Sequence, residues 1–184
     1  MNKHIAGPKT LSRHTILDRG KFLRVELHRV AWPNGRVIDD WAWIITPDYV
    51  NVVAETEDGR LLCFRQVKYA LDGPSLAIVG GYKEPGEEAL AAAQRELREE
   101  TGYEADEWTS LGCYPVDGNR GAGSGHFFLA RNARCVAAPV SDDLEEQEIL
   151  FLTPAEARAA LSRGEFRLMP WAAALAIALL RLLH

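Results

Sequence analysis

Residues 81–103 read Gly-Tyr-Lys-Glu-Pro-Gly-Glu-Glu-Ala-Leu-Ala-Ala-Ala-Gln-Arg-Glu-Leu-Arg-Glu-Glu-Thr-Gly-Tyr. Helix-forming residues dominate this stretch after its proline, so we predict a helix. Glu96, Glu99 and Glu100 are spaced i, i+3 and i+4 and therefore share an arc of about 100° on that helix. A neighbouring apolar stripe, which can pack on a sheet, consists of Leu90, Ala93 and Leu97. One face is expected to anchor the helix while its edge carries clustered carboxylates.

The clustered carboxylates predict a cation site. Like charges this close repel one another by about a few tenths of a kcal/mol per exposed pair. A hard divalent cation would relieve that repulsion, and Mg²⁺ prefers carboxylate oxygen, with Mn²⁺ as an alternative. We expect Glu96 and Glu100 to be ligands and Glu99 to be a shared or second ligand. For the three glutamates alone, a solvated acidic helix face is the competing interpretation.

A longer signature runs through the same stretch. Its fixed positions are Gly81, Glu87, Arg95-Glu96-Leu97, Glu99-Glu100 and Gly102. This pattern resembles the Nudix box, which marks hydrolases of nucleoside diphosphates linked to another moiety. Every glycine and charged position of the box matches, and the one departure is Tyr103, at a packing position where an aliphatic residue is usual. Agreement over so many fixed gaps favours the metal site over the solvated helix.

The resemblance implies the Nudix fold, an α/β/α sandwich around a mixed sheet, in the α+β class. The mixture of strands and helices along the chain agrees with layered packing of this kind. We expect strands at about 22–32, 36–45, 49–55, 60–67, 76–79, 108–116, 126–130 and 149–152. We expect helices at about 87–101, 154–163 and 170–183. Residues 1 to about 20 are expected to be irregular, and the glycine-rich segment from residue 118 to be a flexible loop.

Two parts of the chain are expected to differ in role. Residues 1–46 are predicted to form an N-terminal β-hairpin subdomain, and residues 47–184 the Nudix domain. The hairpin resembles the extra β subdomain of ADP-ribose pyrophosphatase-like members, which commonly dimerise through it, so we expect a homodimer. Trp41 and Trp43 would share one face of a strand and could stack a base, for about 1–3 kcal/mol. Ordinary packing of these tryptophans is the alternative.

Composition limits the possible partners. The chain has 184 residues, 47% hydrophobic and 26% charged, which is ordinary for one soluble globular domain. Its net charge of −5 argues against non-specific binding to nucleic acid. No signal peptide is visible, and the apolar C-terminal run is too short to span a membrane. The three cysteines lack any CxxC pairing and are expected to be reduced in a cytoplasmic protein.

The resemblance also implies roles for residues around the box. The family takes one metal ligand from the backbone carbonyl before the box glycine, here Gly80, and Gly81 lets the chain approach closely. Arg95 is one turn from Glu99, can brace the acids through charge-assisted hydrogen bonds, and is expected with Glu99 among the catalytic residues. Glu87 is a supporting residue at the helix start. Gly102 fits the position that ends the helix.

Three candidates lie outside the box. In this subgroup the general base comes from an acidic loop late in the chain, which favours Glu145 or Glu146. Arg65 lies in a run that resembles the segment before the box in ADP-ribose and sugar-nucleotide pyrophosphatases, and it could contact phosphate. Arg120, in the glycine-rich segment, could meet the substrate from a mobile lid. For each of them a solvated surface position is the alternative.

We therefore predict metal-dependent hydrolysis of the diphosphate linkage of ADP-ribose or a related nucleoside diphosphate sugar, giving two phosphate monoesters. Other dinucleotide or nucleoside diphosphate derivatives are alternative substrates. A non-catalytic Nudix-fold nucleotide sensor is the rival from another class. Close ADP-ribose pyrophosphatases usually read Glu-Leu-Pro-Ala-Gly up to the box glycine, whereas this chain reads Ala-Ile-Val-Gly-Gly at 77–81. This departure affects the expected substrate and leaves the expected metal site intact.

Overall fold

The computed structural model describes residues 6–140 and 147–182. The candidate bases Glu145 and Glu146 lie outside the described residues. The chain forms two compact units. The first takes in the chain up to Pro47 together with Pro115–Ser124, and the second takes in Asp48–Tyr114 and the chain from Gly125 onward.

The first unit is built on three antiparallel strands. They are β1 (Lys9–Asp18), β2 (Arg24–Ala31) and β3 (Val37–Ile45), with a 3-10 turn η1 (Gly20–Phe22) between the first two. The hairpin of β2 and β3 was expected from the sequence. The prediction that residues 1 to about 20 are irregular is wrong for β1, which pairs with β2 along its length. Every residue of β1 is exposed, so no burial pattern marks it as a strand.

The segment Pro115–Ser124 also belongs to the first unit. A flexible loop was expected in this segment, from residue 118 onward. Asp117 Oδ1 accepts hydrogen bonds from the backbone N–H groups of Asn119 (2.7 Å) and Arg120 (2.9 Å). The Arg120 carbonyl accepts from the Ile44 N–H at 2.8 Å. The backbone is therefore tied to the strand β3.

The second unit contains a mixed sheet, as expected. Its main strands follow the spatial order β10 (Gly121–Cys135), β4 (Tyr49–Thr56), β5 (Leu61–Gln66) and β11 (Gln147–Leu152). β10 and β4 are parallel, whereas β5 is antiparallel to both β4 and β11. The shorter or flanking strands are β6 (Ser75–Ala77), β7 (Val79–Tyr82), β8 (Tyr103–Glu104) and β9 (Glu107–Asp117). β7 pairs with β4 and thereby brings the Gly80-Gly81 segment onto the sheet.

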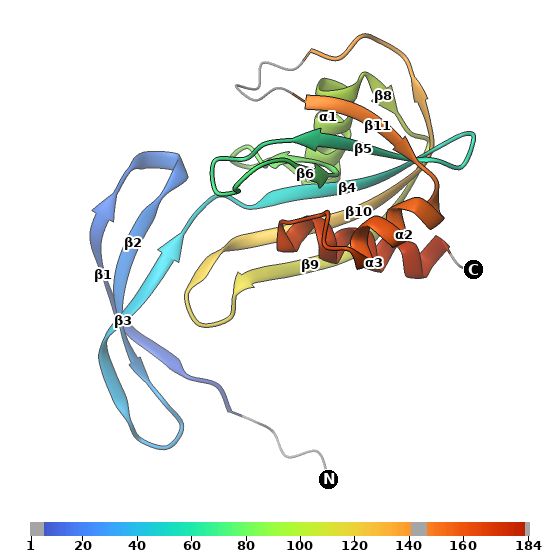
Figure 1. Ribbon diagram of the computed structural model, residues 1–184. Coiled ribbons are helices and arrows are strands. Elements are labelled where there is room, and N and C mark those ends of the chain that lie inside the picture. The colour runs from blue at the N-terminus through green and yellow to red at the C-terminus, as the bar shows by residue number, and fades with distance from the viewer. Residues whose placement is uncertain (1–5, 141–146, 183–184) are drawn as a thin grey trace. The chain divides into compact units, whose positions relative to one another are not determined.

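Three helices cover this sheet. They are α1 (Ala89–Thr101), α2 (Pro154–Ser162) and α3 (Met169–Leu182). α1 packs on β4 and β7, and α3 packs on β4 and on α2. Figure 1 shows α1 on one side of the sheet and the other two helices on the opposite side. The expected sandwich of helices around a mixed sheet is confirmed.

Local signals explain where the helices begin and end. Thr153 and Glu156 form a reciprocal capping box at the start of α2, with Pro154 in its first turn. α1 ends at Gly102, which adopts a left-handed conformation with φ of 73°. A side chain there would also overlap the carbonyl of Ala137, so glycine meets both a conformational and a steric requirement.

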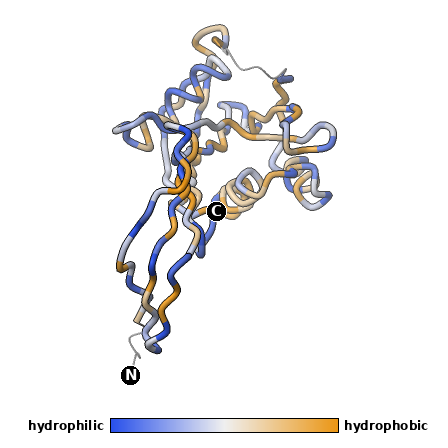
Figure 2. Tube along the Cα trace, turned by 90° about the vertical axis from the view of Figure 1, so that its left-hand side faces the viewer, coloured by the Kyte–Doolittle hydropathy of each residue, from blue (hydrophilic) through white to orange (hydrophobic). Residues whose placement is uncertain are grey.

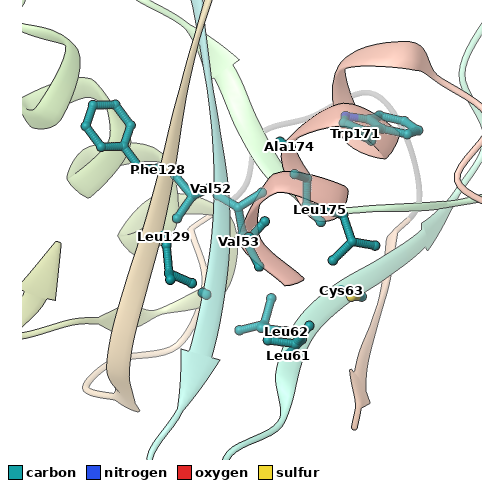
Figure 3. Packing of buried hydrophobic residues seen from close by; sticks show 14 of the residues in the cluster. Val52, Val53, Leu61, Leu62, Cys63, Phe128, Leu129, Trp171, Ala174 and Leu175 are labelled. Atoms are coloured by element: carbon teal, nitrogen blue, oxygen red, sulfur yellow. The ribbon is translucent and has the colours of Figure 1, made fainter. Parts of the chain in front are cut away.

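The core fills the space between the sheet and the helices. Figure 3 shows Val53 of β4 and Leu62 of β5 near Leu175 of α3, all of them buried. In Figure 2 the last helix is drawn mostly in apolar colours, as expected for a helix that packs on a sheet. Burial raises the pKa of the Cys63 thiol to about 12. Among the described residues, no helix combines the length and the apolar character that crossing a membrane requires.

Candidate functional site

The helix α1 carries the acidic residues and is held to the sheet by the apolar residues beside them. Ala92, Ala93 and Leu97 are fully buried in the core. Leu90, which was expected in the apolar stripe, lies in the first turn of α1 and is exposed instead. The edge with Glu96, Glu99 and Glu100 is left beside the strand β7.

Arg95 is the centre of the site's hydrogen bonds. Its Nε and Nη2 donate to the two carboxylate oxygens of Glu87 at 2.9 and 3.1 Å. Its Nη1 donates to Glu96 (2.8 Å) and to Glu99 (3.0 Å), and Nη2 also reaches the carbonyl of Tyr82 at 3.1 Å. One guanidinium therefore joins three carboxylates to the strand β7, as charge-assisted hydrogen bonds of this geometry allow.

The charges of this network stabilise one another. The Arg95 hydrogen bond lowers the pKa of Glu87, with further help from the backbone N–H of Glu84, which donates to Glu87 Oε2 at 2.8 Å. Conversely, the hydrogen bonds to Glu87, Glu99 and Glu96 raise the pKa of Arg95. The lowered pKa of Glu87 favours its ionised form, which pairs with the Arg95 guanidinium.

The two glycines let the acids approach the strand. A Cβ on Gly81 would overlap the Glu96 carboxylate, whose side chain is only 12% exposed. The Gly80 N–H donates to Glu100 Oε2 at 3.2 Å. Gly80, Gly81, Glu96 and Glu100 therefore lie close together. Their expected role in holding a cation stays a prediction.

The donor set suits a hard cation. The side chains of Glu96, Glu99 and Glu100 offer carboxylate oxygens, which hard cations prefer. The expected ligand role of the Gly80 carbonyl stays a prediction. Within residues 6–140 and 147–182, no group of three or more His, Cys, Asp or Glu side chains stands close enough to hold a metal ion as placed. Glu96 and Glu99 are instead turned toward Arg95. A carboxylate has two oxygens and can join a guanidinium and a cation at once.

Arg65 lies elsewhere on the sheet. It is exposed on β5, directly across from Glu148 of β11, and its Nη1 lies 3.3 Å from the Glu148 carboxylate. Exposed pairs of this kind add little stability. Its expected contact with substrate phosphate stays a prediction.

Trp41, Trp43 and Arg120 all belong to the first unit. Trp41 packs against Trp32, with ring centres 5.7 Å apart, and its indole N–H donates to the Asn119 carbonyl at 2.6 Å. Trp43 stacks on His28 at 5.5 Å. Both tryptophans thus have aromatic neighbours already, and their expected role in stacking a base stays a prediction.

One residue near the site was not identified from the sequence. Asn51 is a buried polar residue in the otherwise apolar middle of β4, and its register partner is Gly80. The available signal was a single amide inside the run Val-Asn-Val-Val-Ala at 50–54. The sequence alone does not show that Asn51 lies beside Gly80, because this depends on the register of β4 and β7.

Comparison with known proteins agrees with this geometry. The profile of the NUDIX domain matches residues 46–172. An ADP-ribose pyrophosphatase of Bacillus subtilis (strain 168) is 31% identical over 122 residues, which is 66% of this chain and 65% of that protein. A methanol dehydrogenase activator of Bacillus methanolicus is 31% identical over 102 residues, 54% of each protein. The chain thus spans about two thirds of the first relative's length and about half of the second's.

Two further proteins match over more of the chain. A CMP-5'-(N-acetyl-N-hydroxy-3-aminopropyl)phosphonate hydrolase of Streptomyces rubellomurinus (strain ATCC 31215) is 26% identical over 149 residues, 81% of this chain and 71% of that protein. A crystal structure of an ADP compounds hydrolase superposes with a TM-score of 0.80 at 22% identity, covering 98% of this chain and 97% of that chain. The last likeness shows the fold. Since the NUDIX profile covers most of the chain and includes the whole network around Arg95, the chain belongs to the NUDIX domain family.

Proposed function

We propose that the protein hydrolyses the diphosphate linkage of ADP-ribose or a related nucleoside diphosphate sugar to two phosphate monoesters, with Mg²⁺ or Mn²⁺ as cofactor. The observation that carries this proposal is the cluster formed by Arg95, Glu96, Glu99 and Glu100 beside Gly80. It brings oxygen donors for a hard cation to one edge of a helix that is anchored in the core by Ala92, Ala93 and Leu97.

The ligands of the cation would be the Gly80 carbonyl, Glu96 and Glu100, and Glu99 would be a shared or second ligand. A diphosphate resists attack by water because its own charges repel the nucleophile, and a bound divalent cation would neutralise that charge and activate the water. Arg95 keeps Glu96 and Glu99 in place through its Nη1. Glu145 or Glu146 is proposed to take the proton from the attacking water.

The names of two relatives point to different substrates. A relative at 31% identity is named as an ADP-ribose pyrophosphatase, whereas one that matches 81% of this chain is named as a hydrolase of a CMP phosphonate. Ala77 occupies the position where close ADP-ribose pyrophosphatases usually carry Glu, and it is fully buried. Given this departure and the name of the second relative, we include cytidine derivatives among the candidate substrates.

Trp41 or Trp43 is proposed to hold the base, while Arg65 and Arg120 are proposed to contact the phosphates. Replacing one tryptophan by Ala should raise KM by roughly 10- to 100-fold, from about 1–3 kcal/mol of lost stacking. The kcat should change much less, because base binding acts nearly equally on ground and transition states. Unchanged KM in both well-folded variants would assign the tryptophans to packing alone.

We further propose that the protein is a homodimer joined through its first unit. The edge strand β1 is exposed throughout and presents Leu11 and Ile16, both apolar. Exposed strand edges of this kind pair readily with a second chain. Light scattering on the purified protein measures the mass directly, and a monomer at micromolar concentration would contradict the proposal.

We also propose that the protein works in a reducing compartment, the cytoplasm. The three cysteines, Cys63, Cys113 and Cys135, are free, which supports this proposal.

The proposed activity is tested with a panel of nucleoside diphosphate derivatives that includes ADP-ribose, ADP- and UDP-sugars and cytidine compounds. Phosphate released after phosphatase coupling is measured with Mg²⁺, with Mn²⁺ and with chelator, and Glu100→Gln is the matched control. We expect metal-dependent turnover that the variant loses. Binding of a nucleotide without turnover under any metal condition would favour the regulatory sensor instead.

A further inference from the structure

Asn51 is a buried polar residue on the strand β4. The residue is only 3% exposed, and the residues before and after it on β4, Val50 and Val52, are fully buried. An aliphatic residue would satisfy the burial requirement of this position without any hydrogen-bonding need. The amide therefore calls for a local explanation.

The amide is poorly satisfied where it stands. Its Nδ2 lies 3.5 Å from the Val79 carbonyl, at the outer limit of a hydrogen bond. Its Oδ1 is buried and has no hydrogen-bond partner in the described part of the chain. Leaving such an acceptor unpaired lowers stability, so core packing alone does not account for Asn at position 51.

The same amide lies against the glycine segment of the candidate site. In the register of β4 and β7, Asn51 faces Gly80, and a Cβ on Gly80 would overlap Asn51 Nδ2. The Gly80 N–H, which belongs to the same peptide group as the Val79 carbonyl, donates to Glu100 Oε2 at 3.2 Å. A continuous chain of contacts thus runs from the Asn51 amide through the Gly80 backbone to the Glu100 carboxylate.

We propose that Asn51 is a positioning residue for the cation site. It holds the backbone of Val79 and Gly80 in the place from which the Gly80 N–H orients Glu100 and the Gly80 carbonyl can serve as a ligand. This inference rests on the function proposed above. Mutating a group that orients metal ligands typically lowers metal affinity or activity by about 10- to 100-fold.

The test measures metal binding directly. Asn51→Leu keeps the size of the side chain and removes both polar atoms, and Asn51→Ala removes them without risk of overpacking. Binding of Mn²⁺ to the protein without substrate is followed by the electron paramagnetic resonance signal of free Mn²⁺. We expect the dissociation constant to rise by about 10- to 100-fold in both variants.

Thr56→Val is the matched control. Thr56 is a buried polar residue on the same strand, but its hydroxyl bonds to Asp58 and Arg60 at the opposite end of β4. Thermal unfolding of all variants without metal shows which of them are folded and how much stability each has lost. A variant that loses as much stability as Thr56→Val but binds Mn²⁺ far more weakly supports the positioning role.

The outcomes separate the two proposals. If the parent protein binds Mn²⁺ and hydrolyses substrate while the folded Asn51 variants bind Mn²⁺ as tightly as the parent, the role of Asn51 is refuted and the proposed function stands. Equal weakening in Thr56→Val would also refute it, since the effect would then follow general destabilisation. If the parent neither binds Mn²⁺ nor turns over any substrate, both the proposed function and the proposed role of Asn51 are refuted.

Discussion

Replacing Arg95 by Lys should weaken the fold more than any other conservative change on α1. Lysine cannot reproduce the two-pronged contact that Arg95 makes with Glu87 through Nε and Nη2. A hydrogen bond to a charged group contributes about 1.5–3 kcal/mol, and an ammonium group regains part of this. The Arg95 side chain is 28% exposed, so water compensates only in part. We expect a loss of about 1–3 kcal/mol in the free energy of unfolding.

The assay is thermal and urea unfolding of the metal-free protein at several pH values. For a chain of this size a loss of that order lowers Tm by roughly 2–10 °C. Arg98→Lys is the control, because Arg98 lies on the same helix but is 63% exposed and pairs only with Glu104 among the described contacts. We expect this control to change the free energy of unfolding by less than about 0.5 kcal/mol.

The stability lost in Arg95→Lys should depend on pH in one direction. Because Arg95 lowers the pKa of folded Glu87 below the ordinary value of 4.5, the pair stabilises the fold above that value. The contribution disappears as the pH falls through the lowered pKa. The difference between the parent and Arg95→Lys should therefore be largest near neutral pH and shrink in acid. A variant as stable as Arg98→Lys, or a difference that does not shrink in acid, would refute this reasoning.

Further variants test the remaining roles. Glu100→Gln should keep the fold and lower kcat by about 10²-fold or more, because it removes a ligand charge at nearly constant shape; kinetics within a few-fold of the parent would exclude Glu100 from the ligands. Gly81→Ala adds a methyl against the Glu96 carboxylate, so kcat should fall by about 10- to 100-fold with only a small change in Tm, and undiminished turnover would show that Glu96 can move freely. Of Glu145→Gln and Glu146→Gln, one should lower kcat and leave KM little changed; if both and the double variant behave like the parent, the base lies elsewhere.

Much of the fold follows from local sequence signals. The helix α2 begins where Thr153 and Pro154 predict, and α1 ends at Gly102, because caps and left-handed glycines act within one turn of the chain. The hairpin between β4 and β5 turns at Asp58-Gly59, a dipeptide that favours such turns. These features need no information from distant residues.

The misjudged segments depend on distant partners. β1 has no alternation of buried and exposed residues and is a strand because β2 pairs with it. Gly121 and Gly123 are flexible residues by type, yet they lie close against Trp43 and Thr46 respectively, in left-handed conformations. Neither contact is visible from composition or periodicity.

The candidate site shows the same division. Glu96, Glu99 and Arg95 are neighbours through helical spacing, so the sequence predicted their meeting. The approach of Asn51 to Gly80 depends on the register of β4 and β7, whose paired residues are 27 to 33 positions apart in the sequence. Sheet register is set by the whole hydrophobic pattern and cannot be read from either segment alone.

The first unit has a consequence for how this protein could have been assembled in evolution. Since it is made of two separate stretches, with Pro115–Ser124 supplied from within the sequence of the second unit, it is not a cassette that a gene fusion could add in one step. Removing the chain up to Pro47 would leave the Asn119 and Arg120 carbonyls without the donors that Trp41 and Ile44 now provide. The leading strands and this internal segment would therefore have to be inherited together, and exchanging one between relatives without the other would disrupt both.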